Sequence, residues 1–111
     1  MTDTIIHVGD IGTVFMIPIV EEDGISPIDI SGCTVRKILF KKSNGVKISK
    51  DAIFATDGKD GIIQYTGIDG DIDISGYWHM QGYIELPSGK FYSEITRFKV
   101  EKNLLGVLDG T

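Results

Sequence analysis

Three aspartates occupy alternate positions, Asp69, Asp71 and Asp73, in a glycine-rich stretch just before the only tryptophan of the chain. Alternating carboxylates are the ligands with which a calcium-binding loop of the EF-hand type begins. That loop then requires a glycine for its sharp turn and, further on, a bidentate glutamate. The chain has Ile74 at the first of these positions and Met80 at the second. The EF-hand pattern is therefore not met, and a looser surface calcium site remains as the less favoured alternative.

The other residues that could do chemistry are scattered along the chain. His7 and His79 lie on different expected strands, and neither has a His, Cys or acidic partner at ligand spacing in its own segment. Cys33 is the single cysteine, which excludes an intrachain disulfide and suits a small buried residue. No nucleophile elbow or phosphate loop accompanies the serines and glycines. We therefore predict no metal, no cofactor and no catalytic residue, and we expect that the protein is not an enzyme.

The aspartates have a second interpretation, as a corner that leads into a core strand. Aspartate and glycine form tight turns, and the bend is followed at once by a strand in which apolar and polar residues alternate. The expected inward residues are Trp78, Met80, Gly82, Ile84 and Leu86, and the expected outward residues are Tyr77, His79, Gln81, Tyr83 and Glu85. We predict that Trp78 is interior and that the acidic bend serves the geometry of the chain.

Fourteen glycines and three prolines separate short runs rich in β-branched and aromatic residues, which is typical of an all-β domain. We expect about seven antiparallel strands in a β-sandwich of the immunoglobulin-like kind. The expected strands are Thr4–Val8, Thr13–Val20, Cys33–Lys42, Val46–Ala55, Ile62–Thr66, Tyr77–Leu86 and Lys90–Glu101. Pro18 predicts that its strand lies at an edge or carries a bulge. Asn44 and Gly45 predict a hairpin turn.

The length of the chain, its net charge and the length of its apolar runs limit the class of protein. A chain of 111 residues fits one domain, which we place at residues 1–101, followed by an apolar arm at 102–111. The net charge is −5 and no basic patch gathers on any one segment, so we expect no nucleic-acid partner. No apolar run approaches the ~20 residues that span a bilayer, so we expect no membrane partner. The N-terminal residues do not have the pattern of a secretion signal, so we expect synthesis in a cytoplasm.

Two surfaces are candidate interfaces. The first is the outward face of the Trp78 strand, with Tyr77, His79 and Tyr83, because tyrosines are enriched in interfaces. Coverage of these side chains by a second sheet or an edge loop is the equal alternative. The second is the arm, with Leu104, Leu105, Val107 and Leu108, which we expect to dock on a neighbouring copy or another protein. The basic run Arg36–Lys42 is interpreted as a solvated strand face, with an acidic partner as the less favoured alternative.

Together these segments resemble a known family, the N-terminal domain of phage baseplate upper proteins. The resemblance begins with GDIGTVFMIPIVEEDGISPIDISGCTV, through Gly9, Asp10, Gly12, Pro27, Asp29, Ile30, Gly32, Thr34 and Val35. It continues in TDGKDGIIQY and GDIDISGYW, through Thr56, Asp57, Gly61, Tyr65, Gly70, Asp71, Asp73, Gly76 and Trp78. It ends at Phe98–Val100, so it covers nearly the whole chain.

The resemblance implies an immunoglobulin-like sandwich in the tail or baseplate of a bacteriophage, with no catalytic residues. We therefore expect a virion structural protein, made in the host bacterial cytoplasm, that acts as a rigid docking or adaptor module. Its expected partners are other tail and baseplate proteins, in a homo-oligomer or in several copies per virion. A small tail, adaptor or decoration protein and a baseplate subunit are equal alternatives for its position in the virion. The alternative function is a carbohydrate- or receptor-binding module that contacts a host surface glycan.

Overall fold

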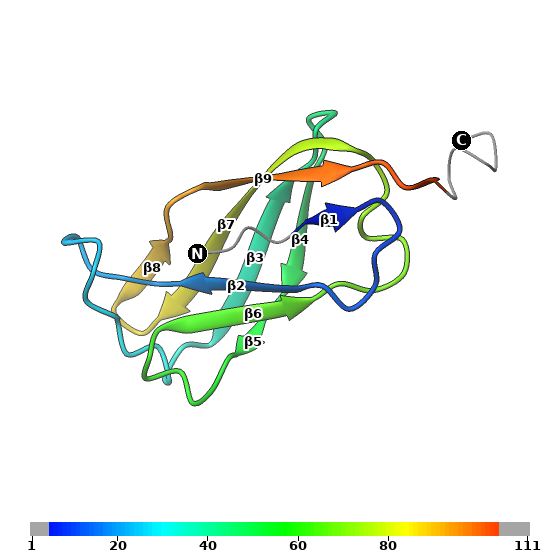
Figure 1. The fold of residues 1–111 in the computed structure, drawn as a ribbon. Helices are drawn as coiled ribbons and strands as arrows, with labels where there is room; N and C mark the ends of the chain where they lie inside the picture. Colours follow the sequence, from blue (N-terminus) through cyan, green and yellow to red (C-terminus); the bar gives the residue numbers. More distant parts are fainter. Residues whose placement is uncertain (1–4, 105–111) are drawn as a thin grey trace.

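The computed structural model describes residues 5–104, and these form two β-sheets that pack face to face (Figure 1). The strands are β1 (Ile6–His7), β2 (Val14–Pro18), β3 (Val35–Lys41), β4 (Lys47–Asp51), β5 (Ile53–Phe54), β6 (Ile62–Thr66), β7 (Gly76–Leu86), β8 (Gly89–Tyr92) and β9 (Thr96–Glu101). The large sheet has the order β1-β9-β7-β3-β4, with β8 also paired to β7, and the small sheet has the order β2-β6-β5. The predicted all-β sandwich is confirmed.

Two of the seven expected strands are each divided in the structure, which gives nine strands among the described residues. The expected strand Val46–Ala55 is one of them. Its first part, β4, pairs with β3 in the large sheet, and its second part, β5, pairs with β6 in the small sheet. The change of sheet occurs at Ala52, which is buried and donates its N–H to the carbonyl of Arg36 over 3.0 Å. The prediction of one continuous strand was therefore wrong.

The expected strand Lys90–Glu101 is the other divided strand. Both β8 and β9 pair with β7, but three residues, Ser93 to Ile95, stand opposite only two residues of β7. This extra residue is a β-bulge, which interrupts the regular backbone pairing. The Ser93 hydroxyl accepts a hydrogen bond from the Gly82 N–H over 2.7 Å and so replaces a missing backbone acceptor.

One pairing differs from the expected antiparallel arrangement. The first strand, β1, pairs with β9 in parallel, with Ile6 opposite Val100 and His7 opposite Glu101. A pairing between segments at the two ends of a chain leaves no turn in the sequence from which it could be predicted. All other strand pairs are antiparallel, as expected.

The turn and edge predictions are confirmed. Residues 42–46 join β3 to β4, and Gly45 has a φ of 88°, which is the left-handed conformation that the turn requires. Pro18 closes β2, which among residues 5–104 pairs only with β6 and is therefore an edge strand of the small sheet. Proline lacks an N–H, so an edge is the position where it costs no ladder hydrogen bond.

The core lies between the two sheets. Phe15 of the small sheet packs edge-on against Phe40 of the large sheet, with ring centroids 5.1 Å apart. Phe40 also contacts Trp78, which is 2% exposed. A β-carbon added at Gly82 would lie 3.0 Å from Ile17 of the small sheet, so this glycine allows the sheets to approach closely. The predicted interior tryptophan and the predicted alternation of β7 are confirmed.

Candidate docking surface

The acidic bend is held by hydrogen bonds within the domain. One carboxylate oxygen of Asp71 accepts hydrogen bonds from the Tyr65 hydroxyl over 2.5 Å and from the Ile68 N–H over 2.9 Å. The other oxygen lies 3.0 Å from the Lys50 ammonium. The Asp71 side chain is 12% exposed, so these three groups replace most of its water. The bend is thereby fastened to β6 and β4.

These contacts shift the titration of both members of the pair. Burial is the largest influence on the Asp71 carboxyl and by itself would raise its pKa. The Ile68 amide, the Tyr65 hydroxyl and Lys50 together outweigh it and lower the pKa below its ordinary value. Burial, and then the bond to Asp71, raise the pKa of Tyr65 to about 12. The pair is therefore a stable structural link, with Asp71 ionised and Tyr65 protonated at neutral pH.

Asp73 has a different partner, whereas Trp78 lines a small cavity together with Tyr65 and Asp71. Asp73 forms an ion pair of 2.9 Å with Lys42, and Trp78 donates its indole N–H to the Ile74 carbonyl over 3.1 Å. Within residues 5–104, the structure has no cluster of three or more His, Cys, Asp and Glu side chains that could hold a metal ion. Over the same residues, no helix is long and apolar enough to cross a bilayer. Cys33 is buried and free.

The outward face of the large sheet brings together the predicted tyrosines and basic residues from other strands. Tyr77 is 50% exposed, and the Arg97 guanidinium lies 4.5 Å from the centre of its ring. Lys99 approaches the same ring at 5.8 Å. A cation over an aromatic ring is favourable because of the quadrupole of the ring. Arg97 and Lys99 are thereby positioned beside an exposed aromatic side chain.

Tyr83 lies at the other end of the same strand. Its hydroxyl donates to the Glu85 carboxylate over 2.6 Å, which together with burial raises the Tyr83 pKa to about 12. Its ring packs against Tyr92, 61% exposed, with ring centroids 4.9 Å apart. The two rings form an aromatic surface that the sequence analysis missed, because Tyr92 was not related to Tyr83 until β8 was paired with β7. His79 lies between Tyr77 and Tyr83 on the same face and is half-buried.

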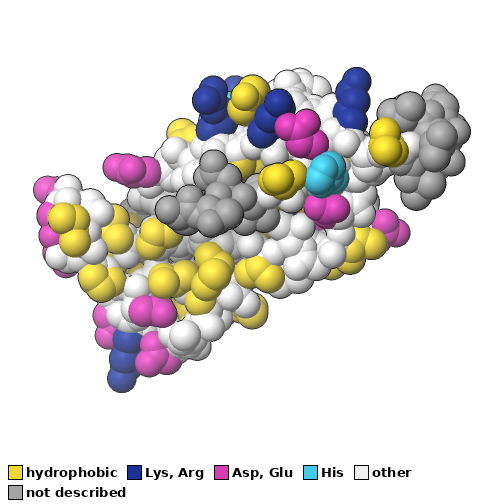
Figure 2. All heavy atoms as spheres, in the orientation of Figure 1, with side chains coloured by type: hydrophobic (Ala, Val, Ile, Leu, Met, Phe, Trp, Pro, Cys, Tyr) yellow, Lys and Arg dark blue, Asp and Glu magenta, His cyan; other side chains and the backbone are white. Residues whose placement is uncertain are grey.

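Strand pairing also gathers basic residues that no single segment concentrates. Lys47 stands opposite Lys41, Lys41 opposite His79, and His79 opposite Arg97, so one basic row crosses β4, β3, β7 and β9. In the sequence, the basic run Arg36–Lys42 supplies Lys41, whereas Lys47, His79 and Arg97 come from other segments. The assembled sheet does carry a basic patch, and Figure 2 shows Lys and Arg side chains gathered along β9 at its margin.

The predicted arm lies only partly within the described residues. Asn103 donates a side-chain hydrogen bond to the Val8 carbonyl, which fastens the start of the arm to the chain beside β1. Leu104 is 79% exposed. Leu105, Val107 and Leu108 lie outside the described residues.

Comparison with known proteins identifies the family. No curated protein has a sequence that matches this chain significantly. The family model described as the BppU N-terminal domain matches residues 2–109, which is nearly the whole chain. The two-sheet fold and the order of the turn and core residues agree with that match. The chain belongs to the family of the N-terminal domain of BppU, the phage baseplate upper protein.

Proposed function

We propose that this protein is a rigid, non-enzymatic docking module of the phage baseplate, present in several copies within an assembly of tail proteins. Membership of a baseplate family supports a structural role in the virion. The observation that carries the docking role is the outward face of the large sheet, where Tyr77, His79 and Tyr83 are exposed or half-exposed beside basic side chains. Tyrosine and arginine are among the residues enriched in protein interfaces.

The core supports rigidity. Aromatic rings from both sheets interlock around Phe40, which contacts Phe15, Tyr65, Trp78 and Phe98. Close-packed interiors resist deformation, so one surface of the domain keeps a fixed geometry relative to another. A module of this kind holds its neighbours at a defined spacing without moving itself.

The arm, residues 102–111, is the second proposed contact. Asn103 fixes its starting point beside Val8, and Leu104 projects an apolar side chain that is 79% exposed. Deletion of residues 104–111 keeps the Asn103 anchor and removes the apolar side chains. Baseplate assembly should then be impaired while the isolated domain keeps its stability. Unchanged assembly would rule out the arm as a contact.

The role in the virion is tested by removing the whole protein. Phage particles made without it should lack a complete baseplate in electron micrographs, and mass spectrometry should find the protein in wild-type particles. Its absence from purified wild-type particles would overturn the proposal.

A carbohydrate-binding role is the second candidate, and it now rests on different residues. Trp78 is 2% exposed and so has no face on which a sugar could stack. The Tyr83 and Tyr92 rings do present an exposed aromatic surface. A glycan array with the wild-type protein and a Tyr92→Ala variant tests this role, and the absence of any bound glycan would remove it.

A further inference from the structure

The basic row on the outer face of the large sheet is not neutralised by the described residues. Lys41, Lys47 and Arg97 are exposed. Within residues 5–104, Lys37 and Lys99 of this face form ion pairs, with Asp51 and Glu101, whereas the three exposed members of the row form none. Side chains paired directly across strands lie about 5 Å apart on one face, and like charges at that distance destabilise a sheet. An anionic partner would relieve this repulsion.

An apolar depression lies beside the row. Lys41, Lys47 and His79 border it, and its other walls include Leu39 and Ile95. Ile95 comes from the bulge between β8 and β9 and is 63% exposed. The surface therefore offers positive charge along one side and exposed hydrocarbon along the other. A partner that fits it carries carboxylates next to one exposed apolar side chain.

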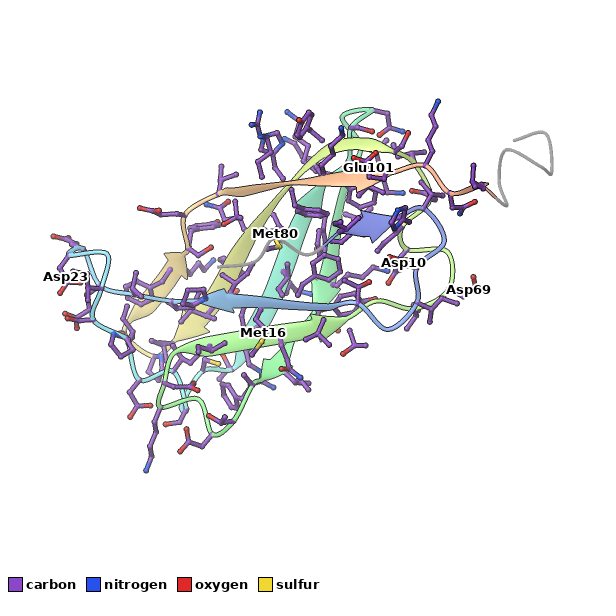
Figure 3. All side chains as sticks on the ribbon, in the orientation of Figure 1. Asp10, Met16, Asp23, Asp69, Met80 and Glu101 are labelled. Atoms are coloured by element: carbon purple, nitrogen blue, oxygen red, sulfur yellow. The ribbon has the colours of Figure 1, made fainter. Side chains whose placement is uncertain are left out.

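The loop between β2 and β3 has this complementary character. Val20 pairs with Pro27 at its base, and the Glu21 N–H donates to the Ser26 carbonyl over 2.8 Å, so the residues between them form a tight projecting tip. We call this the acidic tip; it carries the exposed side chains Glu21, Glu22, Asp23 and Ile25. Figure 3 places Asp23 at its outer end, and Figure 2 shows acidic side chains at that end of the molecule.

The acidic tip combines stable charge with an exposed apolar group. Hydrogen bonds from Ser26 and from the Ile25 N–H hold the pKa of Asp23 below its ordinary value, so the Asp23 carboxylate stays ionised at neutral pH. Ile25 is 82% exposed, more than any other large hydrophobic residue that the structure describes. A solvent-exposed isoleucine among carboxylates matches a depression that has a basic border and apolar walls.

The tip of one molecule lies far from the row of the same molecule. Glu21 and Glu22 share a depression with Leu86 and Ser88, at the end of β7 where β8 begins. His79, a member of the row, lies seven residues before Leu86 on β7, and seven residues span about 20 Å along an extended strand. The two complementary surfaces are therefore available to different copies at the same time.

We propose that the acidic tip of one copy docks on the basic row of the next copy, with Ile25 in the depression beside Leu39 and Ile95. The contact joins two different surfaces, so it closes a ring if its rotation allows closure and otherwise extends a filament. The inference deepens the proposed function by naming a second copy as the partner, and it rests on that function for its place in the virion.

A charge swap tests the contact. The face variant is Lys41→Glu with Lys47→Glu, and the tip variant is Glu21→Lys with Glu22→Lys. By sedimentation equilibrium, the wild type should self-associate, and each variant alone should associate about tenfold or more weakly because both of its surfaces then carry the same sign of charge. An equimolar mixture should recover association, because the copies can alternate with opposite charges in contact. Raising the salt from about 0.1 M to about 1 M should weaken both assemblies, since the Debye length falls from about 10 to about 3 Å.

Two further variants separate docking from misfolding and from general charge effects. Ile25→Ser changes no charge and lies in a loop, and it should also weaken association; Ile53→Ser, at an exposed site on the small sheet, should not. Lys59→Glu alters the net charge half as much as the face variant does, away from both the row and the arm, and should leave association intact. Near-ultraviolet circular dichroism from the buried Trp78 verifies that each variant is folded.

The inference is overturned if an equimolar mixture of the folded face and tip variants remains monomeric. It is also overturned if each variant alone associates as strongly as the wild type. Binding of polyglutamate or of polyphosphate to the row, with a wild type that stays monomeric, also overturns it by giving the row another occupant. Each of these results leaves the proposed function standing if the protein is found in virions. Absence from virions contradicts the proposed function whatever the mixture does.

Discussion

The link between Asp71 and its three partners gives a prediction whose size follows from the structure. The carboxylate accepts hydrogen bonds from Tyr65 and Ile68, contacts Lys50 at 3.0 Å and is 12% exposed. A hydrogen bond to a charged group contributes roughly 1.5–3 kcal/mol. Asparagine keeps one oxygen and replaces the other with a donor, which cannot accept from any partner. We expect Asp71→Asn to lower the free energy of unfolding by roughly 2–4 kcal/mol, a large part of the roughly 5–15 kcal/mol typical of a domain.

Two companion variants show whether the loss comes from this link. Tyr65→Phe removes only the hydroxyl. In a double-mutant cycle with Asp71→Asn, the double variant should lose less unfolding free energy than the sum of the two single losses, because both variants remove one shared hydrogen bond. Asp73→Asn is the matched control. Its carboxylate pairs with Lys42 at 2.9 Å but is 45% exposed, so its loss should cost only about 0–1 kcal/mol.

The same link predicts a pH dependence whose sign is fixed. The folded-state pKa of Asp71 lies below its ordinary value of 3.8. Its stabilisation is therefore fully present above about pH 4 and is lost as the pH falls through the folded-state pKa. Other carboxyls with lowered pKa values are common to wild type and variant, so the difference between the two proteins isolates Asp71.

Urea unfolding followed by the fluorescence of Trp78 measures these quantities. The indole is buried, and it becomes exposed when the domain unfolds. The gap in unfolding free energy between wild type and Asp71→Asn should be constant near neutral pH and should narrow below about pH 4. A gap under about 0.5 kcal/mol, the usual effect of a surface substitution, would show that the link contributes nothing. A gap that persists unchanged at pH 2 would show that the charge of Asp71 is not its source.

Substitutions at three other residues test the fold. Trp78→Ala should cost roughly 3–5 kcal/mol in urea unfolding, because it leaves a cavity beside Phe40, and a loss under about 1 kcal/mol would contradict its interior role. Gly61→Ala should lower the melting temperature, since Gly61 has a φ of 75° and an added β-carbon would lie 2.7 Å from the Ile19 carbonyl oxygen; an unchanged melting temperature would refute that crowding. Ser93→Ala should cost roughly 1–3 kcal/mol because it leaves the Gly82 N–H without its acceptor, whereas Ser93→Thr should restore most of the loss.

Local chemistry allowed several elements to be predicted from the sequence. The turn at Asn44 and Gly45 depends on a conformation that glycine adopts cheaply, and the structure has Gly45 in that conformation. The inward set of β7 follows from the two-residue period of a strand, so Trp78 could be assigned to the core without knowing its partners. Pro18 indicated an edge because a missing N–H has the same consequence in any sheet.

The divided strands could not be predicted in the same way. Residues from Val46 to Ala55 have a continuous extended pattern, and the change of sheet at Ala52 depends on the carbonyl of Arg36, a residue of another strand. The bulge at Ser93 likewise depends on β7, because the Gly82 N–H of that strand donates a hydrogen bond to the Ser93 hydroxyl. In both places a distant strand determines where the chain leaves the ladder, and a pattern within one segment contains no information about that strand.

The basic row was missed for the same reason, and its origin bears on its role. Lys47 lies on β4, an edge strand of the large sheet, where a lysine serves to prevent pairing with another sheet. That explanation does not extend to Lys41 and His79, because β3 and β7 are interior strands with a neighbour on each side. The sheet therefore places Lys41 opposite Lys47 from an interior strand, which protection of an edge does not require. A chain of net charge −5 that concentrates positive charge on one face and places three successive acidic residues on a projecting loop has the charge distribution that the proposed contact between copies requires.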